Sequence, residues 1–130
     1  ICHCLVGSEM CIRDSYRPYM NGKFVFKNAI RRFSEVIIQG LEANNLQVSN
    51  IDMLVPHQAN LRISQYIQKK FKLSDNQVFN NIQNYGNTTA ASIPIALSEA
   101  YDQGKIKHGH TVVLAAFGSG FTWGSVIIKW

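Results

Sequence analysis

The chain has 130 residues, the length of one ordinary domain, and 46% of them are hydrophobic whereas only 16% are charged. This composition excludes a disordered chain, and no apolar run reaches the roughly 18 to 20 residues of a bilayer span. The formal net charge of +5 suits an acidic partner, but the charge is not dense enough for a nucleic-acid-binding tail. We therefore expect one globular domain with neither a membrane nor a nucleic-acid partner.

The three cysteines, Cys2, Cys4 and Cys11, all lie in the first eleven residues. An odd number crowded at one end does not make a disulfide framework, and Cys-x-Cys is tighter than the usual spacing of zinc ligands, so we expect no metal site. The segment also lacks the basic start and the unbroken apolar stretch of a signal peptide. Because VGSEMCIRDS is similar to translated sequencing-adapter sequence, we interpret residues 1–15 as a foreign leader and residues 16–130 as the domain.

The first predicted element is a helix over residues 24–41. Its apolar side chains recur at steps of four and three, the spacing of one helix face: Phe26, Ile30, Phe33, Ile37 and Leu41. The asparagine pair at 44–45 is its expected end. Residues 51–55 then form a short apolar run that Pro56 ends, so we expect a strand whose carboxyl end carries the polar residues 57–60.

Two more helices are predicted from apolar residues that recur at helical spacing. The second covers residues 61–71. The third covers residues 90–101, and Pro94 falls early in it, where a missing N–H costs least. Gly104 is the expected end of this third helix.

Three strands and a loop complete the predicted order. We expect a brief strand at 78–79 and a polar loop over 80–87. Residues 111–116 and 122–130 are apolar and flank a tight turn over 118–120, which predicts a hairpin packed between helices. The order is therefore helix, strand, helix, strand, helix, strand, strand, and the fold class is α/β with layered elements.

Three polar clusters lie at the predicted ends of these elements, where α/β proteins usually place their sites. They are Pro56-His57-Gln58-Ala59-Asn60, Tyr85-Gly86-Asn87-Thr88-Thr89 and Phe117-Gly118-Ser119-Gly120-Phe121. Each cluster alone has a structural alternative: a hydrogen-bonded histidine, a turn with a helix cap, and a tight hairpin. Spacing alone does not connect the clusters to one function.

Three motifs, in combination and in this order, resemble the C-terminal half of the β-ketoacyl-acyl-carrier-protein synthase III family: VPHQANLRI, YGNTTAAS with its continuation through Pro94, Ala96-Leu97 and Glu99-Ala100, and AFGSGFTWGS. The resemblance runs from about Tyr19 to Trp130 and includes MNGKFVFK at residues 20–27. It implies the C-terminal half of a thiolase-like, layered α-β-α-β-α fold. It also implies an acyltransferase that condenses an acyl-CoA primer with malonyl-acyl carrier protein, by decarboxylative Claisen condensation, to initiate fatty-acid biosynthesis.

The resemblance implies a Cys-His-Asn triad in which His57 and Asn87 are the second and third members. Their N–H groups would stabilise the enolate of the decarboxylated malonyl thioester, so we expect their polar atoms within roughly 3–6 Å of each other. The family's nucleophilic cysteine lies in the other half, at a helix start rich in small residues that none of the three cysteines here matches. By itself the chain is therefore expected to be inactive.

Three further sets of residues are implied by the resemblance. The oxyanion and gating loop comprises Phe117, Gly118, Ser119 and Gly120; the pantetheine and coenzyme A contacts are Gly22, Phe26 and Asn60; and the carrier-protein contacts are Arg62, Lys69 and Lys70. Ser119 replaces a glycine of the family, and Lys23 replaces a residue that commonly carries an amide. Acyl carrier proteins are strongly acidic, so a basic helix face would steer their encounter.

The resemblance also implies no cofactor and no metal beyond the substrates acyl-CoA and malonyl-acyl carrier protein, a homodimer in the full-length enzyme, and a cytoplasmic location in a bacterium or a plastid. Two alternatives stay open. One is a related Cys-His-Asn condensing enzyme of secondary metabolism, of polyketide or quinolone type. The other is a basic nucleic-acid-binding domain, which the isoelectric point of about 9.3 allows but which lacks an aromatic-interleaved basic stripe. Elongating ketoacyl synthases use two histidines here and thiolases a second cysteine, and this half has neither feature.

Overall fold

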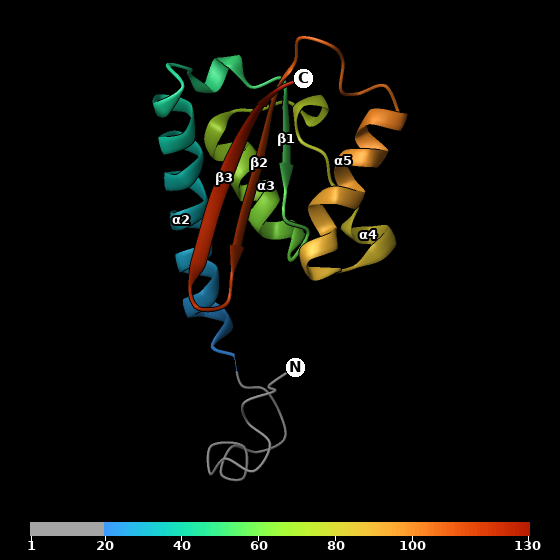
Figure 1. Cartoon of the computed structure of the whole chain (residues 1–130). Helices are drawn as coiled ribbons and strands as arrows, with labels where there is room; N and C mark the ends of the chain where they lie inside the picture. The colour runs from blue at the N-terminus through green and yellow to red at the C-terminus, as the bar shows by residue number, and fades with distance from the viewer. Residues whose placement is uncertain (1–19) are drawn as a thin grey trace.

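The computed structural model describes residues 20–130, in which a three-stranded sheet lies between helices (Figure 1). The long elements are the helices α2 (Gly22–Ala43), α3 (Leu61–Phe71) and α5 (Ser92–Asp102) and the strands β1 (Met53–Pro56), β2 (Thr111–Gly118) and β3 (Thr122–Lys129). Short helical turns occupy Val48–Asn50, Asp75–Gln77, Ile82–Tyr85 (α4) and Thr89–Ala91. The α/β class and the order of the long elements are confirmed. The three cysteines, the expected leader over residues 1–15 and the expected start of the domain at residue 16 lie outside the described residues.

The sheet has the order β1-β2-β3, with β1 parallel to β2 and β2 antiparallel to β3. Met53 pairs with Val112 in the parallel pair, and Val113 pairs with Ile127 in the hairpin. A parallel pair needs a long crossover connection, which here contains α3 and α5. All four residues of β1 are buried, because both faces of this strand are covered.

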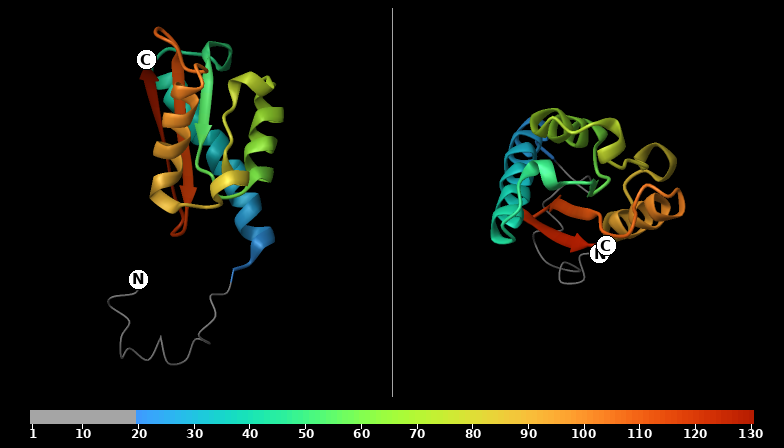
Figure 2. Two further views of the ribbon diagram at one scale, coloured as in Figure 1. Left: turned by 90° about the vertical axis from the view of Figure 1, so that its right-hand side faces the viewer. Right: turned by 90° about the horizontal axis from the view of Figure 1, so that it is seen from above.

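Helices cover both faces of the sheet (Figure 2). On one face, α2 and α3 pack against the strands through Phe33, Ile37, Leu54, Ile67 and Val113. On the opposite face, α5 packs against the alternate strand residues through Met53, Val55, Ala96, Ala100 and Val112. Successive residues of a strand point to opposite faces, so β1 and β2 contribute to both apolar clusters.

Two predicted elements differ from the structure because contacts between residues distant in sequence determine them. The strand expected at 78–79 is a single β-bridge between Val78 and Leu54. The loop expected over 80–87 contains the one-turn helix α4, and the side chain of Gln58, 23 and 24 positions away, accepts hydrogen bonds from the N–H groups at its start. A cap supplied from that distance leaves no local pattern in the sequence.

The predicted hairpin of β2 and β3 is confirmed, but its two strands are not equally covered. β2 is mostly buried, whereas β3 is the edge strand and packs against α2 through Ser125 and Ile127. Trp123 and Val126 on β3 are 41% and 56% exposed. The expectation that the hairpin packs between helices therefore holds for β2 and is wrong for this part of β3.

Asparagine side chains cap the first turns of α2 and α3, which both begin near the lower end of the sheet in Figure 1. Asn21 accepts from the Phe24 N–H at 3.1 Å at the start of α2, and Asn60 accepts from the Arg62 N–H at 3.0 Å at the start of α3. Asparagine is favoured at this position because its carboxamide oxygen satisfies an N–H that the helix leaves unpaired. Both helices begin near the carboxyl end of β1 and the hairpin turn (Figure 1).

Gly40 allows α2 to lie close against β3. A Cβ at this position would lie 2.7 Å from Ser125 Oγ, which donates a hydrogen bond to the Val36 carbonyl at 2.8 Å. We expect Gly40→Ala to lower the melting temperature in thermal unfolding, although alanine favours a helix over glycine by about 1 kcal/mol. The steric collision outweighs this preference, because overpacking typically costs about 1–3 kcal/mol.

The matched control is the double variant Gly40→Ala/Ser125→Ala, which lacks the colliding oxygen. In the Ser125→Ala background, alanine at position 40 should leave the melting temperature unchanged or raise it, and the difference measures the coupling between the two positions. A higher melting temperature for Gly40→Ala alone would contradict the close approach of α2 to β3.

Candidate functional site

A cavity of about 1290 Å³ lies where the carboxyl ends of β1 and β2 meet the starts of α2, α3 and α5. Because β1 and β2 are parallel, their carboxyl ends lie at the same edge of the sheet, the usual position of sites in α/β proteins. The expected site residues that line the cavity are Gly22, Phe26, His57, Asn60, Arg62, Asn87, Phe117, Gly118, Ser119 and Gly120. Lys69 and Lys70 do not line it. The three polar clusters of the sequence therefore meet at one cavity.

His57 follows β1 directly and is held through both its main chain and its side chain. Its backbone N–H donates to the Ala115 carbonyl at 2.8 Å, which extends the pairing of β1 with β2. Its Nδ1 lies 2.5 Å from Ser92 Oγ in the first turn of α5. The imidazole is half-buried, and burial lowers the pKa of His57. Burial therefore favours the neutral ring, and among residues 20–130 no hydrogen bond engages Nε2, the ring nitrogen left for a ligand.

Gln58 is buried and links the first polar cluster to the segment that leads to the second. Its Nε2 donates to the carbonyls of Pro56 and Phe79, at 2.7 and 3.3 Å. Its Oε1 accepts from the backbone N–H groups of Asn81 and Ile82, at 3.1 and 3.2 Å. A carboxamide offers two donor hydrogens and two acceptor lone pairs, so its whole hydrogen-bonding capacity is used. The end of β1 is therefore fixed to the segment that leads to the second cluster.

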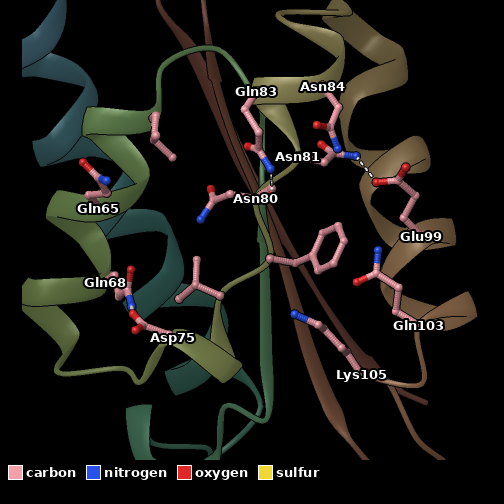
Figure 3. A pocket seen from close by; sticks show the side chains of 13 residues that line it. Gln65, Gln68, Asp75, Asn80, Asn81, Gln83, Asn84, Glu99, Gln103 and Lys105 are labelled. Carbon is pink, nitrogen blue, oxygen red and sulfur yellow. Dashed lines mark hydrogen bonds between the residues drawn. The ribbon is translucent and has the colours of Figure 1, made fainter.

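Glu99 of α5 anchors the loop that precedes Asn87. One carboxylate oxygen accepts from Asn81 Nδ2 at 2.8 Å (Figure 3), and the other accepts from the Tyr85 hydroxyl. The hydrogen bond from Tyr85, and to a smaller extent that from Asn81, lowers the pKa of Glu99. The same bond to the Glu99 carboxylate raises the pKa of Tyr85. Gly86 then turns the chain with φ of +69°, a conformation that carries no Cβ penalty for glycine.

The Asn87 carboxamide is oriented by the helical turn that follows it. Its Oδ1 accepts from the backbone N–H of Thr89 at 2.9 Å. Within residues 20–130 its Nδ2 group donates to no protein acceptor, so its two N–H bonds are available to a ligand in the cavity. His57 and Asn87 line the same cavity, and their expected separation of roughly 3–6 Å stays a prediction.

The turn between β2 and β3 forms another wall of the cavity, and aromatic contacts tie it to α2. The ring centroids of Phe117 and Phe121 are 4.9 Å apart, and that of Phe121 lies 5.8 Å from Phe24 in the first turn of α2. Gly120 has φ of +138°, and a Cβ there would lie 3.1 Å from Thr122 Cγ2. The turn therefore requires glycine at this position.

The basic residues of α3 form an exposed row that starts at the cavity. Arg62 lies in the first turn and lines the cavity, whereas Lys69 and Lys70 lie in the last turn. At offsets of seven and eight residues they lie on the same side of the helix as Arg62. Lysines at a helix C-terminus also interact favourably with the helix dipole, which is the structural alternative to a role in binding.

A second pocket of about 440 Å³ lies between α3, α4 and α5 (Figure 3). Its polar wall consists of Gln65, Gln68, Asp75, Asn80, Asn81, Gln83, Asn84, Glu99, Gln103 and Lys105. Several of these side chains are paired with one another, such as Gln68 with Asp75 and Asn81 with Glu99. None of the expected site residues lines this pocket, so the candidate site is the larger cavity.

Among residues 20–130, no helix combines the length and the apolar character needed to cross a bilayer. In that same range, no three His, Cys, Asp or Glu side chains group closely enough to hold a metal ion. The Cys2-His3-Cys4 segment, for which the sequence predicted no metal, lies outside it.

Comparison with known proteins identifies the family. Residues 41–130 match the family described as 3-oxoacyl-[acyl-carrier-protein (ACP)] synthase III C terminal. The chain belongs to this family. The resemblance inferred from the three motifs is therefore confirmed.

Full-length members of the synthase III family extend the match. The chain is 52% identical over 111 residues to a β-ketoacyl-[acyl-carrier-protein] synthase III of Clostridioides difficile, and this match covers 85% of this chain and 34% of that protein. The structure of this chain matches the crystal structure of the synthase III from Aquifex aeolicus VF5 with a TM-score of 0.83 at 43% identity, over 86% of this chain and 36% of that one. The Thermus thermophilus synthase III matches with a TM-score of 0.86 at 42% identity, over 89% and 36%. The expected thiolase-like fold is thus confirmed, and the chain spans about a third of the length of these relatives.

The residues that hold the candidate synthase III site residues in place were not predicted from the sequence. Gln58 and Ser92 stand inside the motifs HQAN and TTAAS, but neither received a role. Glu99 lies in the continuation of the second motif, and the sequence assigned it no role either. For Gln58, the available signal was a polar residue shortly after an apolar strand. This signal does not reveal which groups the side chain contacts.

Gln58→Glu tests the link between the end of β1 and the segment that starts α4. The new carboxylate would face the carbonyl oxygens of Pro56 and Phe79, which need donors. An uncompensated buried charge costs roughly 3–5 kcal/mol, so we expect a large fall in the free energy of unfolding in urea at pH 7. Burial raises the pKa of such a carboxyl above its unfolded value, so the loss should shrink as the pH falls through the raised pKa.

The matched control is Gln65→Glu, the same chemical change at an exposed position of α3. It should change the free energy of unfolding little and without this pH dependence. Equal effects of the two variants would contradict the role of Gln58 as a buried link.

Proposed function

We propose that this chain is the C-terminal part of a β-ketoacyl-acyl-carrier-protein synthase III that initiates fatty-acid biosynthesis. One observation carries the proposal: two side chains that line a single cavity each have one polar atom engaged by the protein and one nitrogen left without a protein partner among residues 20–130. The His57 Nδ1 is engaged by Ser92, and the Asn87 Oδ1 accepts from Thr89, which leaves Nε2 and Nδ2 for a ligand. The rest of the full-length enzyme supplies the nucleophilic cysteine, because none of the cysteines of this chain has the expected sequence context.

The first half-reaction transfers the acyl group to that cysteine. The thiolate attacks the thioester carbonyl of acyl-CoA, the new C–S bond forms, and the thiol of coenzyme A leaves. This covalent step divides one difficult transfer into two easier ones. The loop from Phe117 to Gly120 borders the same cavity, which supports a role for its backbone N–H groups in stabilising the oxyanion of this step.

The second half-reaction uses the donors of this chain. The malonyl group loses carbon dioxide, and the electron pair of the broken C–C bond moves to the thioester oxygen as an enolate. His57 Nε2–H and Asn87 Nδ2–H donate to that oxygen, and one such donor is typically worth ~3–4 kcal/mol. The enolate carbon then attacks the acyl-cysteine, the thiolate leaves, and β-ketoacyl-carrier protein is released.

Three further residues that line the cavity suit the pantetheine arm that both substrates carry. Gly22, Phe26 and Asn60 line the cavity near the starts of α2 and α3, and a Cβ at Gly22 would have no heavy atom within 4 Å. Phe26 gives an apolar surface and Asn60 a polar one. We therefore assign them to the pantetheine arm of coenzyme A and of the carrier protein.

The exposed basic row of α3 is the proposed docking surface for the acidic carrier protein. Arg62 lies at the cavity and Lys69 and Lys70 further along α3, so the carrier would approach over the entrance to the site. Positive charge there raises the rate of encounter with an acidic partner. The proposed enzyme needs no cofactor or metal besides its substrates, and we place it as a homodimer in the cytoplasm.

The proposed roles of His57 and Asn87 can be tested in a chimera. In this chimera, residues 20–130 replace the matching C-terminal segment of the Clostridioides difficile relative. We expect His57→Ala and Asn87→Ala each to lower malonyl decarboxylation by ~10²–10³-fold, since each removes one donor to the enolate oxygen. Labelling of the cysteine by radiolabelled acetyl-CoA should stay close to that of the unsubstituted chimera.

The controls are His108→Ala and Asn76→Ala, which remove the same side chains at exposed positions that do not line the cavity. Both should leave decarboxylation and cysteine labelling unchanged. Decarboxylation that survives in His57→Ala or Asn87→Ala would sink the proposed function of this pair.

Arg62→Glu tests the docking surface in the same chimera. We expect the KM for malonyl-carrier protein to rise severalfold and the KM for acyl-CoA to stay nearly unchanged, because the charge steers the acidic protein. Lys69→Glu with Lys70→Glu should act in the same direction more weakly. At about 0.5 M salt the Debye length is about 4 Å, so the differences should shrink.

The matched control for charge is Lys107→Glu, at an exposed position on the loop before β2 that neither belongs to α3 nor lines the cavity. It should leave both KM values unchanged. If Arg62→Glu raised both KM values equally, the residue would act in the cavity or in folding, and the docking assignment would be wrong.

A further inference from the structure

Ser92 contacts the candidate site from behind the imidazole of His57. It is the first residue of α5 and is 2% exposed. Its Oγ lies 2.5 Å from His57 Nδ1 and 3.3 Å from the backbone nitrogen of Gln58. One hydroxyl therefore contacts both the ring of His57 and the main chain of the next residue.

The hydrogens of this group of atoms can be assigned from the donors present. The Gln58 backbone N–H can only donate, so Ser92 Oγ accepts from it. Within residues 20–130, the one acceptor within hydrogen-bond distance of the Ser92 hydroxyl hydrogen is His57 Nδ1. If Nδ1 carried a hydrogen, two N–H groups would point at the same oxygen and the buried hydroxyl hydrogen would have no partner, which is unfavourable. The Nδ1 atom is therefore the acceptor.

We propose that Ser92 is a positioning residue that holds His57 as the neutral tautomer with its hydrogen on Nε2. The tautomer of a histidine is set by the hydrogen bond that its other nitrogen makes. Ser92 thereby directs an N–H toward the cavity, where the opposite tautomer would present a lone pair that repels an enolate oxygen. Its importance for catalysis rests on the proposed function, whereas the tautomer itself does not.

The position of Ser92 supports a role in orientation as well as in protonation. It stands at the start of α5, and α5 packs on β1 through Ala96 and Ala100. The hydroxyl is therefore carried by a helix fixed to the strand that His57 follows. Burial also lowers the pKa of His57, which favours the neutral ring that this hydrogen bond requires.

The tautomer can be measured directly in the 130-residue chain with isotope-labelled histidine. Long-range proton–nitrogen NMR spectra distinguish a protonated from an unprotonated ring nitrogen, and His57→Ala identifies the His57 signals. We expect an unprotonated Nδ1 and a protonated Nε2 in the unsubstituted chain at pH 8. In Ser92→Ala we expect the Nδ1 signal to shift toward that of a nitrogen that exchanges between the two tautomers.

Ser64→Ala is the matched control, because Ser64 is also buried and its hydroxyl donates to a side-chain acceptor, Asn80 Oδ1 at 2.6 Å. It removes a comparable hydrogen bond without touching His57, so the His57 signals should not change. A hydrogen on Nδ1 in the unsubstituted chain, or identical His57 spectra for Ser92→Ala and the unsubstituted chain, would overturn the proposal.

Kinetics of the chimera complete the test. We expect Ser92→Ala to lower malonyl decarboxylation about tenfold relative to Ser64→Ala, with cysteine labelling by acetyl-CoA retained, and Ser92→Thr to restore part of the rate. A shifted tautomer with an unchanged rate would refute the positioning role. An unsubstituted chimera that acylates its cysteine without decarboxylating malonyl thioester would instead refute the proposed function and leave the tautomer assignment standing.

Discussion

The side chain of Gln58 is the constraint on which the rest of the site depends. Its four hydrogen bonds join the end of β1 to the segment that starts α4. A buried carboxamide is costly unless every donor and acceptor is paired, so this side chain has one favourable placement. His57 precedes it in the chain and Asn87 follows the segment that it holds. The link therefore fixes the end of β1, which His57 directly follows, to the segment that leads to Asn87.

Helix α5 holds both His57 and the loop before Asn87 through two of its polar side chains. Ser92 contacts the ring of His57, and Glu99 holds Asn81 and Tyr85 of the loop before Asn87. In each of the two proposed donor groups, protein atoms engage one polar atom and leave another for a ligand. Such preorganised donors need no rearrangement when negative charge develops, which is the basis of electrostatic stabilisation in enzymes. The family to which the chain belongs and the cavity that it forms are consistent with that use.

The sequence predicted the apolar framework well because local periodicity carries that information. The stripe through Phe33 and Ile37 predicts α2, and the apolar run before Pro56 predicts β1. The motifs also predicted which residues meet at the cavity, through a resemblance to a family. Physical spacing could not reveal the links that hold them, because Gln58 and Ser92 reach partners 21 to 35 positions away. The exposed apolar residues of β3 were missed for the same reason, since strand coverage is a property of the assembled layers.

The central claim is that His57 and Asn87 donate together to one thioester oxygen. The most direct measurement is a crystal structure of the chimera with a bound malonyl-thioester analogue that keeps its carbonyl oxygen. The account predicts that this oxygen lies about 2.7–3.1 Å from both His57 Nε2 and Asn87 Nδ2. An oxygen that contacts neither side chain, or that His57 approaches through Nδ1, would contradict it.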